Sequence, residues 1–127
     1  MLTHYIFVRR DLPIGTLTAM VTHAAGESAV KYECNQINIF NDPIFKGATA
    51  VVLEAKHEVH LKDIAKYLKD NKIEFIEVHE SGGDYNGQFM AIGLVPIERE
   101  EVAIKLRDFQ TLKTCLSSQV SDNAGLI

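Results

Sequence analysis

The chain has 127 residues, 46% of them hydrophobic, and a formal net charge of −4 at neutral pH. This length suits one domain that buries its own core, and the sequence has no apolar run long enough to cross a membrane. Because phosphate backbones are bound by lysine and arginine, the acidic balance argues against a general nucleic-acid binder. The first residues lead into a strand rather than a secretory leader. We therefore expect a cytoplasmic protein, with Cys34 and Cys115 as reduced thiols.

The first predicted element is a strand over residues 4–9, which are mostly aromatic and β-branched. Arg9 and Arg10 stand at its carboxyl end, where α/β proteins place ligand sites. Both are candidates for phosphate binding, although one of them is expected to turn outward and pair with Asp11. The Asp-Leu-Pro-Ile-Gly run 11–15 ends the strand and opens a turn.

A helix is predicted from residue 16 to about residue 36. One stripe recurs at three- and four-residue steps and is expected to face the sheet: Leu17, Met20, Val21, Ala24, Ser28 and Tyr32. Gly26 lowers helix stability relative to alanine, so we expect it to allow close approach of the helix to the sheet. His23 is expected near the inner stripe, where a structural role is the usual one.

Residues 37–47 combine turn formers with large apolar side chains and predict a packed connection. The nearly continuous apolar run 48–55 is typical of a central strand buried on both faces. Residues 59–71 alternate apolar and charged residues with helical spacing, which predicts an amphipathic helix with a solvated lysine face.

The last part of the domain is predicted to contain a strand at 73–79, a polar loop at 80–87 and a strand at 88–95, which together form a hairpin. A helix follows at 97–108, with acidic residues first and basic residues last, as the helix dipole favours.

This order of elements predicts a single α/β domain with a four-stranded mixed β-sheet sandwiched between α-helices. We expect the domain to span residues 1–112 and to be followed by a loosely ordered tail over residues 113–127.

Four short segments, in this order and spacing, resemble the type 2 peptidyl-tRNA hydrolase family. They are Val8-Arg9-Arg10-Asp11-Leu12, His23-Ala24-Ala25, Ala50-Val51-Val52-Leu53 and Ala91-Ile92-Gly93. The resemblance implies a small mixed sheet between helices and cleavage of the ester between a peptide and its tRNA.

The family's motif residues are replaced in this sequence. Alignment from His23 puts Thr16 at the family's catalytic lysine and Met20 at its glutamine. The family's Asp-Ala-Gly-Arg-Thr motif corresponds to Glu80-Ser81-Gly82-Gly83-Asp84, which keeps an acid and a glycine but lacks the arginine and threonine. Loss of two basic residues beside acidic ones disfavours an anionic substrate such as tRNA.

The remaining polar groups define the candidate site. The candidate catalytic residues are Thr16, Glu80 and Asp84, and the candidate substrate-binding residues are Arg9, Arg10, Gly15, Thr18 and His23. Helix-start hydroxyls often serve only as caps, and two carboxylates on a glycine loop are often simply solvated. Glu80 with Asp84 could hold a metal, but we predict neither a metal nor a cofactor.

Two functions from different classes follow. The first is a divergent peptidyl-tRNA hydrolase-like enzyme that cleaves an aminoacyl or peptidyl ester with altered specificity. The second is a catalytically inactive member of the fold that binds a small ligand or a protein. The expected partners are tRNA or a small anionic ligand, with no membrane, and the chain is expected to form a homodimer.

Overall fold

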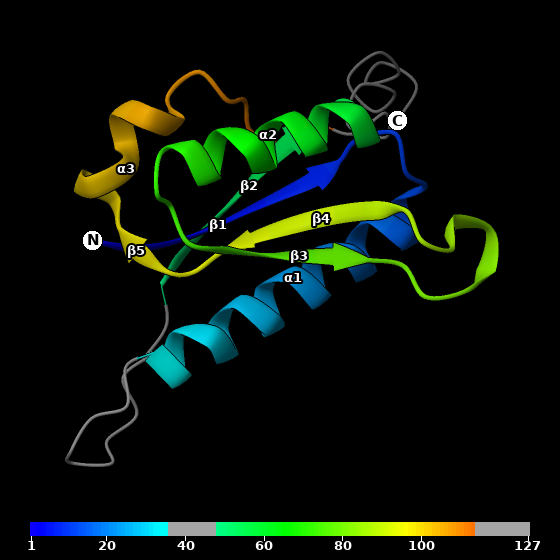
Figure 1. The fold of residues 1–127 in the computed structure, drawn as a ribbon, viewed down its shortest axis with the longest axis horizontal. Helices are drawn as coiled ribbons and strands as arrows, with labels where there is room; N and C mark the ends of the chain where they lie inside the picture. Colours follow the sequence, from blue (N-terminus) through cyan, green and yellow to red (C-terminus); the bar gives the residue numbers. More distant parts are fainter. Residues whose placement is uncertain (36–47, 114–127) are drawn as a thin grey trace, which may run out of the picture.

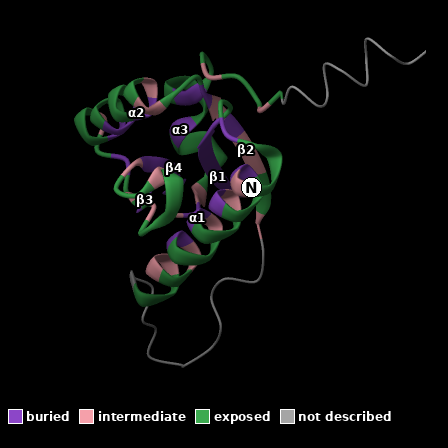
Figure 2. Cartoon of the chain, turned by 90° about the vertical axis from the view of Figure 1, so that its right-hand side faces the viewer, coloured by how far each residue is buried: buried purple, intermediate pink, exposed green. Residues whose placement is uncertain are grey.

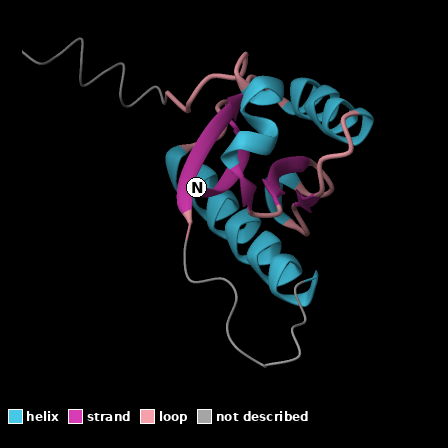
Figure 3. Ribbon diagram, turned by 90° about the vertical axis from the view of Figure 1, so that its left-hand side faces the viewer, coloured by secondary structure: helices cyan, strands magenta, loops and turns pink. Residues whose placement is uncertain are grey.

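The computed structural model describes residues 1–35 and 48–113, which form a mixed β-sheet between two layers of helices (Figures 1 and 3). This arrangement confirms the predicted α/β sandwich. The predicted connection over 37–47 and the predicted tail beyond Lys113 lie outside the described residues.

The sheet has the order β2-β1-β4-β3, with a very short fifth strand beside β1. The strands are β1 (Leu2–Arg9), β2 (Thr49–Ala55), β3 (Phe75–His79), β4 (Phe89–Leu94) and β5 (Ile97–Glu98). β1 and β2 are parallel, whereas β4 is antiparallel to both β1 and β3. The predicted mixed sheet and the β3–β4 hairpin are confirmed. β5 was not predicted, because its two residues stand at the start of the helix expected over 97–108.

Helices cover both faces of the sheet. α1 (Ile14–Asn35) lies on one face, and α2 (Glu58–Asp70) and α3 (Arg99–Leu106) lie on the other (Figure 1). The alternation along β1 explains this, since Ile6 and Val8 join the core under α1, whereas Tyr5 and Phe7 join the core under α2. Figure 2 shows the buried side of each helix turned toward the strands. Within the described ranges, no helix is long and apolar enough to cross a membrane.

The prediction that residues 48–55 form a central strand is wrong, because β2 lies at an edge of the sheet and its first two residues are exposed. The chain after α3 covers this edge. The backbone N–H of Glu54 donates to the carbonyl of Gln110, and that of Leu112 donates to the carbonyl of Val52, each at 2.9 Å. This cover explains how an edge strand keeps an apolar sequence.

Gly26 does not provide the close contact between helix and sheet. It is exposed, and a Cβ added there would meet nothing within 4 Å. The close approach occurs instead at Gly93 in β4, which lies directly against the backbone of α1 at Ala24 and against the hydroxyl of Ser28. The sequence therefore indicated the correct contact surface but the wrong glycine.

Candidate functional site

The predicted site residues Arg9, Arg10, Gly15, Thr16 and Glu80 lie along the edge of the sheet where β1, β2 and β3 end and β4 begins. This edge lies at the right of Figure 1, and both α1 and α2 begin there. Three connections meet at this edge: the turn after β1, the β2–α2 connection and the loop between β3 and β4. In α/β folds, this is the edge at which ligands bind.

Arg9 is buried at this edge and is fully engaged by neighbours. Its Nε and Nη2 donate to the two carboxylate oxygens of Asp11 at 3.0 and 2.9 Å. Its Nη1 donates to Oε1 of Gln88 at 2.8 Å and to the carbonyl of Phe89 at 3.3 Å. The ion pair raises the pKa of Arg9 and lowers that of Asp11. Arg9 thus ties the first turn to the start of β4. An arginine does pair with Asp11, but it is the buried Arg9 and not the outward-turned arginine that the sequence predicted.

Replacing Arg9 by methionine should lower the free energy of unfolding by about 2–4 kcal/mol, because it removes a buried charge that satisfies several acceptors at once. Denaturant titration followed by circular dichroism measures the change. Arg107→Met is the matched control, since Arg107 is exposed and its ion pair with the exposed Asp108 is long, at 4.0 Å. The free energy of unfolding of this variant should stay within about 0.5 kcal/mol of the wild type. Equal stability of the two variants would contradict the role given to Arg9.

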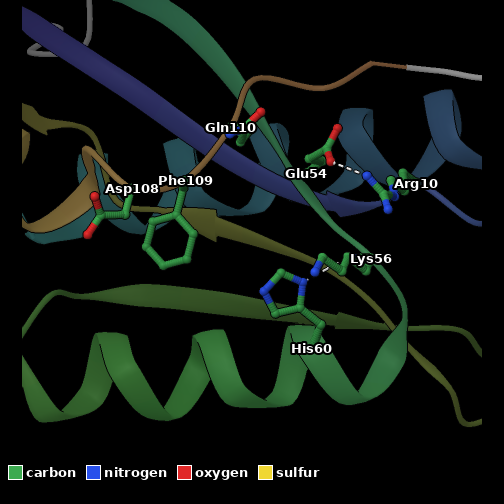
Figure 4. Close-up of a pocket in the computed structure, with 7 residues that line it drawn as sticks. All are labelled: Arg10, Glu54, Lys56, His60, Asp108, Phe109 and Gln110. Atoms are coloured by element: carbon green, nitrogen blue, oxygen red, sulfur yellow. Dashed lines mark hydrogen bonds and ion pairs between the residues drawn. The ribbon is translucent and has the colours of Figure 1, made fainter. Parts of the chain in front are cut away.

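Arg10, unlike the buried Arg9, is partly exposed to solvent. It is 45% exposed and its Nη1 lies 2.6 Å from Oε2 of Glu54. The other oxygen of Glu54 accepts the backbone N–H of Lys113 at 3.1 Å. Arg10 and Glu54 line one end of a cavity of about 380 Å³ (Figure 4). The two predicted phosphate-binding arginines are therefore separated: Arg10 lines this cavity and Arg9 does not.

The start of α1 carries two threonines, Thr16 and Thr18, whose hydroxyl groups differ in their hydrogen bonding. The hydroxyl of Thr18 donates to the carbonyl of Ile14 at 2.8 Å, so it bonds to its own helix rather than to a substrate. The hydroxyl of Thr16, which is half-buried, makes no hydrogen bond to any residue in the described part of the chain. The first bond into the helix runs from the N–H of Leu17 to the carbonyl of Pro13. The N–H groups before it, including that of Gly15, have no backbone partner in residues 1–35 and 48–113, as is usual for a first helical turn, and such groups can bind an oxyanion.

Glu80 begins the loop between β3 and β4. Its backbone N–H donates to the carbonyl of Gln88, and its carbonyl accepts from Gly87, which closes the base of the loop. Its half-buried carboxylate accepts the N–H of Ser81 through Oε1 at 3.0 Å. The backbone therefore fixes Glu80, while Oε2 has no hydrogen-bond partner among residues 1–35 and 48–113.

The same loop contacts the α1 side of the core. Tyr85 packs against the apolar cluster that includes Leu12, Leu17 and Met20. Asp84 is exposed in the one-turn 3₁₀ helix Gly83–Tyr85. In the described part of the chain, no three His, Cys, Asp or Glu side chains come together as metal ligands. The loop thus reaches the α1 side of the core through Tyr85, and Met20 is buried in the same cluster.

The prediction that His23 lies near the inner stripe of α1 is wrong. It is exposed and lies with Gly26 and Glu27 along a shallow groove on the solvent side of the helix. Its neighbour Ala24 is the fully buried residue at this level of the helix. Because His23 points away from the sheet, it is remote from the groups at the strand ends.

Sequence reasoning missed Gln88, His60 and Phe109. Gln88 is the polar first residue of an otherwise apolar predicted strand, and it bonds to Arg9. That polar position was the available signal for its role. His60 and Phe109 meet only because the segment after α3 returns to the edge beside α2, so no local pattern marked them.

A comparison with known families identifies the class of this α/β domain. Residues 2–112 match the family peptidyl-tRNA hydrolase PTH2. The chain therefore belongs to the peptidyl-tRNA hydrolase PTH2 family, which confirms the resemblance seen in the sequence. A search of curated proteins found no match.

Proposed function

We propose that this chain hydrolyses aminoacyl or peptidyl esters and that its specificity is shifted from full-length tRNA toward esters of lower negative charge. The family gives the reaction class. The shift in specificity is inferred from the charges at the strand ends.

The observation that carries the proposal is the engagement of Arg9 by Asp11. It neutralises Arg9, and α1 contains no lysine or arginine before Lys31, so the start of α1 carries no free cation. Arg10, the other arginine of the β1–α1 turn, pairs with Glu54 and lines the cavity beyond β1 and β2. Glu80 and Asp84 add negative charge on the adjacent loop. Because tRNA binding requires cations that neutralise phosphates, the start of α1 and the adjacent loop favour an ester whose alcohol part carries few phosphates.

The remaining groups supply the elements of ester hydrolysis. The Glu80 carboxylate accepts a proton from water as the water oxygen attacks the ester carbonyl carbon. The Thr16 hydroxyl orients that water, and the free N–H groups at the start of α1 bind the developing oxyanion. Collapse of the tetrahedral intermediate breaks the ester bond, and the leaving alkoxide takes the proton back from Glu80.

The test is turnover of N-acetylphenylalanine esterified to adenosine, an ester without phosphates. The purified protein should release N-acetylphenylalanine faster than buffer does. Thr22→Ala is the control, because the hydroxyl of Thr22 bonds only to the carbonyl of Thr18 on α1, and it should keep wild-type turnover.

No turnover of this ester, or of an N-acetylaminoacyl-tRNA, would support the second reading, a catalytically inactive binding module. The proposal of ester hydrolysis would then be wrong. The cytoplasmic location and the homodimer stay predictions, and light scattering on the eluting protein tests the second.

A further inference from the structure

A separate cavity opens beyond the ends of β1 and β2, on the opposite side of the α1 junction from Glu80. It has a volume of about 380 Å³ and is lined from four parts of the chain: the end of β1, β2 with its connection to α2, the first turn of α2, and the segment after α3. This volume is in the range of small-molecule sites. Figure 4 shows Arg10 and Glu54 at one end, Phe109 and Asp108 at the other, and His60 between them.

One end of the cavity is lined mainly by cationic and hydrogen-bond-donating groups. The carboxylate of Glu54 is satisfied on both oxygens, by Arg10 and by the backbone N–H of Lys113. Arg10 uses only Nη1 in this pair, and its other side-chain N–H groups have no partner within the described ranges of the chain. Lys56 lines the same cavity and has no ion-pair partner among the described residues. An anion with several oxygens suits this end, because arginine binds such groups through more than one N–H.

His60 is held as a hydrogen-bond donor. Its Nδ1 accepts the backbone N–H of Lys56 at 2.9 Å, and its own backbone N–H donates to Nδ1 of His57 at 3.2 Å. Burial lowers the pKa of His60, and the charges of Lys56, His57 and Arg10 lower it further, against an opposing effect of Asp63. The ring is therefore neutral at pH 7 and carries its proton on Nε2.

Phe109 supplies an apolar surface at the other end. Its ring packs edge-on against Phe7, with centroids 5.0 Å apart, and against Tyr67 at 5.7 Å. These contacts fix the ring, while the residue remains only half-buried. A fixed aromatic ring at a cavity wall is a surface on which a planar base can stack.

We infer that this cavity binds a nucleoside monophosphate, with the phosphate at Arg10, Lys56 and His60 and the base against Phe109. Asp108 accepts a hydrogen bond from a ribose hydroxyl or a base amino group. The ligand is either a free nucleotide or the phosphorylated end of an RNA strand, since both carry the same chemistry. The inference does not rest on ester hydrolysis, because Glu80 and Thr16 do not line the cavity.

Isothermal titration calorimetry with AMP, adenosine and inorganic phosphate tests the site. AMP should bind with a Kd on the order of 10 µM to 1 mM. Adenosine and phosphate should each bind with a Kd at least about tenfold higher. Arg10→Met and Phe109→Leu should each weaken AMP binding about tenfold. Arg99→Met is the control and should bind AMP as the wild type does, because Arg99 is exposed at the start of α3 and does not line the cavity. Glu80→Gln should also bind AMP, which separates this site from the proposed hydrolysis.

NMR titration of the histidine ring protons gives a second readout. A bound phosphate should raise the pKa of His60, so AMP binding should strengthen as the pH falls toward that pKa. A 5′-phosphorylated RNA hexamer distinguishes the two sources: tighter binding than AMP indicates a strand end, and equal or weaker binding indicates a free nucleotide. If AMP binds no better than phosphate, or if neither Arg10→Met nor Phe109→Leu weakens it, the inference is wrong.

Discussion

Glu80→Gln should lower kcat for ester hydrolysis by about 10²–10⁴-fold, the usual effect of losing a general base. The substitution removes the negative charge but keeps the shape of the side chain. The amide oxygen of glutamine can still accept the N–H of Ser81, and the backbone bonds of Glu80 to Gly87 and Gln88 are unaffected. The loop should therefore keep its conformation, and unfolding midpoints should match those of the wild type.

Glu77→Gln is the matched control for this measurement. Glu77 lies in β3, the strand that ends just before Glu80, and its carboxylate is 2.9 Å from His79. Its side chain belongs to the side of β3 that faces α2. It should keep wild-type kcat. Steady-state assays with the adenosine ester measure both variants, and a Glu80→Gln enzyme within about twofold of the wild type would exclude Glu80 as the base.

Gly93→Ala should destabilise the fold by about 3 kcal/mol or more, at the upper end of the cost of overpacking. The new methyl group would lie 2.7 Å from Oγ of Ser28 and closer still to the carbonyl oxygen of Ala24. Ser28 cannot rotate away freely, because its hydroxyl bonds to that same carbonyl and to Nε2 of His4, each at 2.6 Å. Relief therefore requires α1 to move away from the sheet.

Gly26→Ala, in the helix α1 that packs against Gly93, has the opposite expected effect on stability. Gly26 is exposed and has open space around it, so alanine should stabilise the protein by about 0.5–1 kcal/mol through helix propensity. Thermal and denaturant unfolding of both variants measure the pair. A Gly93→Ala protein as stable as the wild type would contradict the close packing of α1 on β4.

The sequence correctly predicted the elements whose apolar residues recur with a clear helical or strand period, or which are bounded by a clear polar loop. The apolar stripe of α1 from Leu17 to Ser28 and the buried positions of α2 at Leu61, Ile64 and Leu68 are where their spacing placed them. The β3–β4 hairpin followed from its polar loop. These features are local, so a single sequence contains the information that defines them.

Contacts between segments that are distant in the sequence could not be predicted from such local patterns. The position of β2 at an edge depends on the segment near Gln110, which hydrogen-bonds along it. The close contact between α1 and the sheet involves Gly93 rather than Gly26, because Gly93 faces α1 whereas Gly26 faces away from the sheet. Arg9 and Arg10 are adjacent in sequence, yet one is buried with Asp11 and the other lines a cavity. Each of these depends on partners far along the chain.

The central claim is that this member of the peptidyl-tRNA hydrolase PTH2 family acts on esters between the start of α1 and Glu80, where the side chains supply no free cation. The most direct measurement compares kcat/KM for N-acetylphenylalanyl-tRNA and for the adenosine ester, each at 50 and 200 mM salt, roughly the range over which phosphate contacts lose affinity. We predict a higher kcat/KM for the adenosine ester and little salt dependence for either substrate. A strong preference for the tRNA, with a kcat/KM that falls steeply with salt, would contradict the claim.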